Sequence, residues 1–279
     1  LIFSLYYFLG YLIDENIWYK YANKNLVTSY QIIKDTEEDN PFFDQACKFN
    51  IISDDEKSLS NRLSKCRDNY GNAVFVLGDS HAKNIVNAFG YSERYPFIIG
   101  IAQGGCRPHG CRVNRENQYD FFKNKVLNLI KDEDIIIFHQ SGSYLFKDRS
   151  GNNKQTLIFE EGNYTIDDER ISKIDSYLSE IALRTNAKII WLTPFIEYRK
   201  NPKEIISEIR KNNSYEKYKT INKFSIKAFN ELEEKFKKMQ TSKYEILLFD
   251  DFYKVSNKAQ ILDEYGNVCF QFRDQDHFS

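Results

Sequence analysis

From about residue 72 onward, short apolar runs alternate with longer amphipathic ones. Five runs of mainly β-branched and other apolar residues end at polar or glycine-bearing residues, which predicts buried β-strands. Between them, apolar residues recur at helical spacing, which predicts amphipathic helices. Strands joined through helices favour a parallel sheet with right-handed crossovers, and hence a layered α/β domain. The predicted strands are 73–77, 97–101, 135–139, 188–193 and 244–250, and the predicted helices are 82–89, 119–131, 168–185 and about 215–238.

The first 71 residues follow a different pattern. Residues 1–13 are apolar and uncharged, and we interpret them as the end of a transmembrane helix, because a complete span needs roughly 20 such residues. A signal-peptide remnant and a buried helix are the alternatives. Residues 14–71 are polar and irregular, with one short helix predicted over 58–67. This region is predicted to be a connector packed on a catalytic domain of residues 72–279.

The composition narrows the class of protein. A chain of 279 residues with 42% hydrophobic residues can bury a substantial core. The formal net charge of -1 argues against a strong general affinity for nucleic acid, so we expect no nucleic-acid partner.

The five cysteines indicate the compartment. Cys106 and Cys111 flank a turn-forming Arg-Pro-His-Gly insert and form one plausible disulfide. Cys47 and Cys66 form a second, which leaves Cys269 over. Reduced thiols in a cytosolic protein are the alternative, but the apolar segment upstream favours an oxidising compartment. We expect no metal site, because no second closely spaced cysteine pair and no histidine cluster accompany Cys106 and Cys111.

The site of an open parallel sheet lies beyond the carboxyl ends of its strands. Residues 78–81, Gly-Asp-Ser-His, follow the first predicted strand and open the first helix. Ser80 is therefore placed where the helix dipole and unpaired amides point, which makes it a candidate nucleophile. The alternative is that Ser80 only caps the helix. The second strand end carries Gly104 and Gly105, whose backbone can approach a substrate closely.

Two later segments complete the candidate site. A serine nucleophile needs a base that is held in one tautomer by a third group. His277 lies three residues after Asp274, a spacing at which the carboxylate can reach the imidazole within one turn. We expect His139, which closes the third strand, to be structural. Residues 146–163 form a long polar excursion that is predicted to be a hairpin or a lid, with a solvated loop as the alternative.

These motifs resemble those of a known family. Gly-Asp-Ser-His at 78–81, together with Asp-x-x-His at 274–277, is similar to the SGNH hydrolase family. The GDSH form, Gly-Cys-Arg-Pro at 105–108 and the ending Asp-Gln-Asp-His-Phe-Ser at 274–279 more closely resemble the SGNH domain fused behind membrane acyltransferase-3 domains. The resemblance covers 72–279. It implies a three-layer flavodoxin-like α/β fold, with a central, mostly parallel five-stranded sheet.

The resemblance also implies roles for individual residues and requires no cofactor. Ser80 attacks an acyl carbonyl, His277 acts as general base and then acid, and Asp274 orients the imidazole. The oxyanion is held by the backbone amide of Ser80 and by an amide of Gly104 or Gly105. Asp79, within the turn, is expected to brace it.

One block departs from the family pattern. The family usually has Gly-x-Asn-Asp at its third block, whose asparagine supplies an oxyanion donor, whereas this chain has His-Gln-Ser-Gly-Ser at 139–143. The stand-ins for that donor are Gln140, Ser141 and Ser143. The same three residues and His81 are the predicted substrate-binding set.

The resulting prediction is an O-acyltransferase domain, with acetyl as the expected acyl group and a hydroxyl of a cell-surface glycan, such as lipopolysaccharide, as the acceptor. The acyl donor is expected from a fused or associated membrane acyltransferase-3 domain. The domain is expected to be membrane-anchored, in the periplasm or on the extracytoplasmic face. A free-standing carbohydrate esterase and a catalytically inactive glycan-binding module are the alternatives.

Overall fold

The structure is a computed structural model, and it describes residues 46–51, 56–111, 117–148, 150–151, 164–195, 197, 223–239 and 241–249. The chain divides into two compact units. All described residues belong to one of them, which comprises Pro41–Tyr198 and Asn222–Val255. The fold described below is that of this unit.

A parallel sheet forms the centre of the unit, and the described residues contribute six strands to it in the order β1-β3-β2-β6-β9-β10. From β3 to β10, this is the flavodoxin-like strand order. The predicted fold class, α/β with a mostly parallel central sheet, is therefore confirmed. The strands are β1 (Lys48–Asn50), β2 (Val74–Gly78), β3 (Ile98–Ala102), β6 (Ile135–His139), β9 (Lys188–Leu192) and β10 (Glu245–Leu247).

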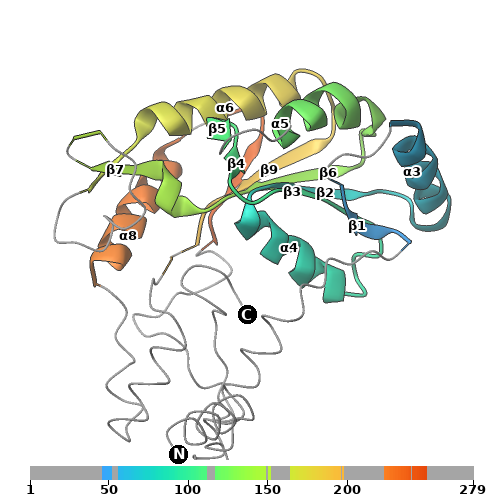
Figure 1. The fold of residues 1–279 in the computed structure, drawn as a ribbon, viewed down its shortest axis with the longest axis horizontal. Coiled ribbons are helices and arrows are strands. Elements are labelled where there is room, and N and C mark those ends of the chain that lie inside the picture. The colour runs from blue at the N-terminus through green and yellow to red at the C-terminus, as the bar shows by residue number, and fades with distance from the viewer. Residues whose placement is uncertain are drawn as a thin grey trace, which may run out of the picture. The chain divides into compact units, whose positions relative to one another are not determined.

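Helices cover both faces of this sheet (Figure 1). Helix α4 lies on one side, and α5 and α6 lie on the other. Strand β2 runs between β3 and β6 and is buried at every position, which explains its continuous run of apolar residues. The described helices are α3 (Glu56–Tyr70), α4 (Ser80–Tyr91), α5 (Gln118–Phe121), α6 (Asp168–Ala182) and α8 (Lys223–Lys238).

Strand β1 corrects the predicted count of five strands. It pairs with β3 at the edge of the sheet, in a segment that was predicted to be an irregular connector. Three residues inside a polar segment are too few for a periodic pattern to show a strand. Its place is fixed instead by contacts between distant residues. The predicted disulfide between Cys47 and Cys66 is confirmed and ties β1 to α3, and the side chain of Asn50 accepts a hydrogen bond of 3.2 Å from the Ala102 amide.

The helix predicted over 119–131 is also different in the structure. It consists of α5, a π-helical turn over Phe122–Val126 and a 3₁₀ turn over Leu127–Leu129. The buried apolar pairs at 121–122 and 126–127 are five residues apart, and a π turn has an i to i+5 hydrogen-bond pattern. In the π turn, both pairs face the core. In a regular helix of 3.6 residues per turn, residues five positions apart point in different directions, so the two pairs would not share one face.

Two antiparallel hairpins interrupt the alternation of strands and helices. Strands β4 (Cys106–Arg107) and β5 (Gly110–Cys111) place Cys111 directly opposite Cys106. Cys106 is disulfide-bonded. Strands β7 (Phe146–Asp148) and β8 (Tyr164–Ile166) form the base of the hairpin predicted over 146–163. Most of that excursion, 149 and 152–163, lies outside the described residues, so its function as a lid stays a prediction.

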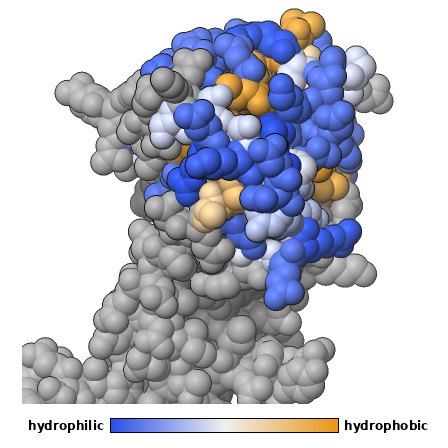
Figure 2. All heavy atoms as spheres, turned by 90° about the vertical axis from the view of Figure 1, so that its right-hand side faces the viewer, coloured by the Kyte–Doolittle hydropathy of each residue, from blue (hydrophilic) through white to orange (hydrophobic). Residues whose placement is uncertain are grey.

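The described surface is mainly polar. The face shown in Figure 2 is mostly hydrophilic, with small separate hydrophobic areas. Among the described residues, Tyr70 and Leu183 are the large hydrophobic side chains that are exposed. No helix within the described ranges is long and apolar enough to cross a membrane, and residues 1–13 lie outside those ranges.

Candidate active site

Ser80 lies at the carboxyl end of β2, as the first residue of α4. The N-cap of α4 is Asp79, whose carboxylate accepts a hydrogen bond of 2.9 Å from the His81 amide. Capping is therefore performed by Asp79, and this excludes the alternative that Ser80 only caps the helix. Ser80 is half-buried, and no described residue forms a hydrogen bond with its hydroxyl. The hydroxyl is thus presented at a helix N-terminus without a partner from the described part of the chain.

The glycine before this turn is required by close packing. A Cβ atom at position 78 would overlap the carbonyl oxygen of His139 and lie 2.6 Å from the Cβ of Ala82. The Gly78 carbonyl accepts hydrogen bonds from the Gln103 amide, at 3.1 Å, and from the side-chain amide of Gln118. The turn that carries Ser80 is therefore pressed against the neighbouring strand and tied to two other segments.

The glycine pair after β3 lies beside the serine. A Cβ atom built on Gly104 would be 3.8 Å from the Cβ of Ser80. Gly105 has a φ of 86°, in the left-handed region that glycine adopts without strain. Within the described residues, neither glycine amide donates a hydrogen bond. The structure therefore brings Ser80 and Gly104 together, as the sequence predicts, and leaves amide donors near the serine.

Asp79 braces the turn, as expected. Its carboxylate is buried and accepts hydrogen bonds from the Ser141 amide, at 3.2 and 3.1 Å, and it forms an ion pair of 3.1 Å with Arg107. Burial alone would raise the pKa of Asp79, but the hydrogen bond from His81 and the positive charges of His81 and Arg107 outweigh it and hold the pKa well below its usual range. Asp79 is therefore ionised, and it joins α4, the β4–β5 hairpin and the loop after β6.

A second buried carboxylate, Glu197, lies in the segment after β9. Its Oε1 atom accepts hydrogen bonds from the Ser141 hydroxyl, at 2.6 Å, and from the Ser143 amide, at 3.0 Å. The hydroxyls of Ser141 and Ser143 are 2.8 Å apart. His81 is buried between the two carboxylates, 3.6 Å from Asp79 and 4.0 Å from Glu197. Three of the four predicted substrate-binding residues thus belong to one buried network, and their contact with substrate stays a prediction.

The other two polar residues after β6 are also buried. His139 stacks against Phe195, and its Nδ1 atom lies 3.1 Å from the carbonyl oxygen of Leu192. Burial, and then the charge of His81, lower the pKa of His139 to about 4, so its ring is neutral and Nδ1–H donates to Leu192. This fits the expected structural role. The Gln140 carboxamide is buried and has no hydrogen-bond partner among the described residues.

Sequence reasoning missed Arg107 and Glu197. Arg107 is part of the Gly-Cys-Arg-Pro segment that carries the family resemblance. That motif does not predict the ion pair between Arg107 and Asp79. No sequence signal marked Glu197.

Asp274 and His277 lie outside the described residues, so the triad stays a prediction. In the described part of the chain, no group of three or more His, Cys, Asp or Glu residues is arranged to hold a metal ion.

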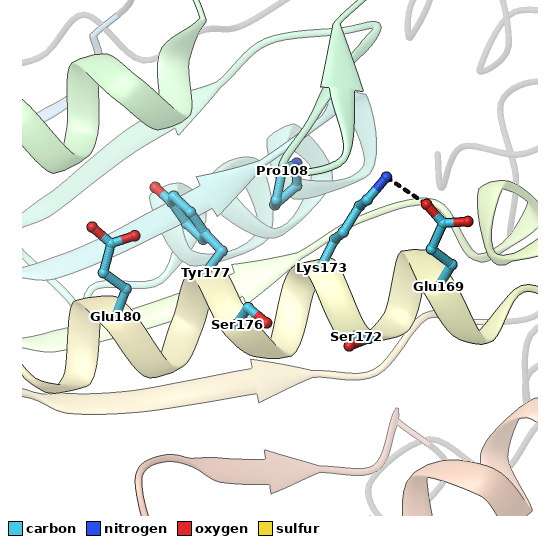
Figure 3. Close-up of a pocket in the computed structure, with 7 residues that line it drawn as sticks. All are labelled: Pro108, Glu169, Ser172, Lys173, Ser176, Tyr177 and Glu180. Carbon is cyan, nitrogen blue, oxygen red and sulfur yellow. Dashed lines mark ion pairs between the residues drawn. The ribbon is translucent and has the colours of Figure 1, made fainter.

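A pocket of about 520 Å³ lies along α6 (Figure 3). Pro108, from the turn of the β4–β5 hairpin, closes one side of it, and Tyr177 lies in its lining. The Tyr177 hydroxyl donates a hydrogen bond of 2.9 Å to the Tyr119 carbonyl. Lys173 and Glu169 form an ion pair of 2.8 Å along the helix surface. None of the predicted site residues lines this pocket.

Comparisons with known proteins agree with this architecture. A family model described as "SGNH domain (fused to AT3 domains)" matches residues 44–279. Among solved structures, the chain is similar to the lipopolysaccharide acetyltransferase periplasmic domain of Salmonella ser. Paratyphi A, with 16% identity, 90% coverage of each chain and a TM-score of 0.52. At this identity, the likeness shows a shared fold. A search of curated proteins finds no match.

Proposed function

Because this chain belongs to the family of SGNH domains that are fused to AT3 domains, we propose that it transfers an acyl group through Ser80 to a hydroxyl of a cell-surface glycan. The observation that carries the proposal is the placement of Ser80, with a hydroxyl that no described residue binds, at the N-terminus of α4 and beside Gly104. A helix N-terminus favours developing negative charge, as acyl transfer requires. Acetyl is the proposed acyl group.

The proposed reaction has two halves. Ser80 Oγ attacks the acyl carbonyl while His277, oriented by Asp274, takes its proton. The oxyanion is held by the Ser80 amide and an amide of Gly104 or Gly105, and the leaving group departs with the proton from His277. A glycan hydroxyl then attacks the acyl-serine and gives its proton to His277. The ester forms on the glycan, and His277 returns the proton to Ser80.

The proposed setting is extracytoplasmic, with the acyl group delivered by an AT3 domain. The family is described as fused to AT3 domains, and a disulfide joins Cys47 to Cys66 while Cys106 is also disulfide-bonded. Disulfides persist in oxidising compartments such as the periplasm. A lipopolysaccharide hydroxyl is the proposed acceptor class, because the chain shares its fold with the periplasmic domain of a lipopolysaccharide acetyltransferase.

The test compares Ser80→Ala and His277→Ala with wild type. We expect each variant to lose at least ~10³-fold in turnover of p-nitrophenyl acetate, as removal of a triad member does in serine hydrolases, and to lose O-acetylation of cell-surface glycan. Ser176→Ala, an exposed serine on α6, is the matched control and should retain both. Wild-type activity in either triad variant would refute the assignment. Ester hydrolysis without any transfer to glycan would identify an esterase.

A further inference from the structure

The Glu197 carboxylate is placed where it can control the position of Ser80 without touching it. It is fully buried, and its Oε1 atom accepts hydrogen bonds from the Ser141 hydroxyl and from the Ser143 amide. These donors flank Gly142, where a Cβ atom would be 2.4 Å from a ring carbon of Phe229 and 2.8 Å from the Cβ of Pro194. The loop after β6 is therefore closely packed, and Glu197 fixes its two serines from one side.

The same loop is bonded to the nucleophile turn from its other side. The Ser141 amide donates to both carboxylate oxygens of Asp79. Asp79 in turn caps α4 at the His81 amide, immediately beyond Ser80. Each link is a hydrogen bond between a buried carboxylate and a donor, which is stronger than a bond between two neutral groups. A displacement at Glu197 is therefore passed through Ser141 and Asp79 to the start of α4.

We propose that Glu197 is a positioning residue for Ser80: it fixes Ser141 and Ser143, and through Asp79 it sets the orientation in which the serine attacks an acyl carbonyl. The inference rests on the proposed function, because it assigns Ser80 the role of nucleophile. It also gives the Ser141 and Ser143 hydroxyls a role in holding the loop, since the Ser141 hydroxyl donates to Glu197 and the two hydroxyls bond to each other.

The experiment uses the full chain and compares Glu197→Ala and Glu197→Gln with wild type. It measures the rate at which a fluorophosphonate labels Ser80, and kcat and KM for p-nitrophenyl acetate. We expect Glu197→Ala to lower the labelling rate and kcat by ~10²-fold, the cost of a misplacement of about 1 Å, with little change in KM. Glu197→Gln should recover much of the loss, because its amide oxygen can still accept from Ser141 and Ser143. Glu180→Gln, an exposed carboxylate on α6, is the control and should match wild type.

A double-mutant cycle tests the path. Because Asp79 and Glu197 act through the same serine, the effects of Asp79→Asn and Glu197→Ala on the labelling rate should be less than additive. Additive effects, or a labelling rate per folded molecule in Glu197→Ala equal to that of wild type, would overturn the inference. If Glu197→Ala does not fold, Ser141→Ala replaces it, and a labelling rate within twofold of wild type would overturn the inference. An unlabelled wild type would overturn the proposed function as well, whereas a labelled wild type with unaffected variants would overturn this inference alone.

Discussion

The turn around Ser80 and the pocket along α6 both collect charged and hydroxylated side chains, but they hold them differently. At the turn, the ion pair between Asp79 and Arg107 is buried and joins segments that are distant in the sequence. Along α6, the ion pair between Glu169 and Lys173 is exposed and joins residues one helical turn apart (Figure 3). Polar composition alone does not distinguish the two regions.

The difference shows which polar clusters determine a structure. An exposed pair one turn apart contributes little to stability, because water screens it and both side chains lose conformational freedom. A buried carboxylate must be paired, so its partners are fixed once the chain folds. The network around Asp79 therefore fixes the place of the nucleophile, whereas the exposed Glu169–Lys173 pair links only residues of the same helix. The predictions below test this contrast.

The largest effect is expected at the centre of the network. Asp79→Ala leaves the buried guanidinium of Arg107 without its carboxylate and removes the cap of α4. Loss of one partner of a buried ion pair costs about 3–5 kcal/mol. We expect the free energy of unfolding in urea to fall by an amount in this range. Asp79→Asn should lose less, because its side-chain oxygen can still accept from the His81 amide. If Asp79→Ala lowered the free energy of unfolding no more than Glu169→Gln on α6, the buried network and the exposed pair would not differ in their contribution to stability.

A comparable effect is expected from pH at His139. Burial lowers the pKa of His139 to about 4 in the folded protein, against an ordinary value of 6.5 for histidine. The unfolded chain therefore binds a proton as the pH falls below 6.5 while the folded protein does not, and the free energy of unfolding decreases by about 3 kcal/mol by pH 4. His139→Asn, whose amide can still donate to Leu192, should show a shallower decrease between pH 6.5 and pH 4.

The decrease in stability is to be measured as urea midpoints across that pH range, so that the slopes are compared rather than the absolute stabilities. Burial, Arg170 and Arg107 also lower the pKa of His109 to about 3, so part of the decrease remains in the variant. Identical slopes in wild type and His139→Asn would contradict a buried, neutral His139.

The smallest effect is expected on α6. Glu169→Gln removes one member of an exposed ion pair with Lys173. Because both side chains are largely exposed, we expect no measurable change in the urea midpoint and none in ester turnover. A clear loss of turnover in this variant would show that the pocket along α6 takes part in the reaction.

Periodicity predicts most of this fold because the central strands β2, β3 and β6 bury continuous runs of mainly apolar residues. The strand 135–139 was predicted with the bounds of β6, and the run at 73–77 lies within one residue of β2. Strand β1 was missed because its pairing with β3 and the Cys47–Cys66 disulfide determine it, rather than its three residues. In 118–129, the buried pairs are five residues apart and the segment contains a π turn. Apolar periodicity along the sequence predicts an ordinary helix there.

The candidate site was predictable only as far as its local motifs extend. Ser80 follows from a strand, a glycine turn and a helix start, and its proximity to Gly104 follows from adjacent strand ends. The bonds from Glu197 to Ser141 and Ser143 join residues more than 50 positions apart, as the separations of 56 and 54 show. No spacing rule encodes such contacts. Asp274 and His277 rest on the motif at the end of the chain and stay predictions.

The most direct test of the central claim is covalent labelling of the protein with a fluorophosphonate, followed by peptide mapping by mass spectrometry. A serine activated by a histidine reacts with this probe, whereas an ordinary surface serine does not. The account predicts a single adduct on Ser80, absent from Ser80→Ala and strongly reduced in His277→Ala. An unmodified Ser80 in folded wild-type protein, or an adduct that persists in Ser80→Ala, would contradict it.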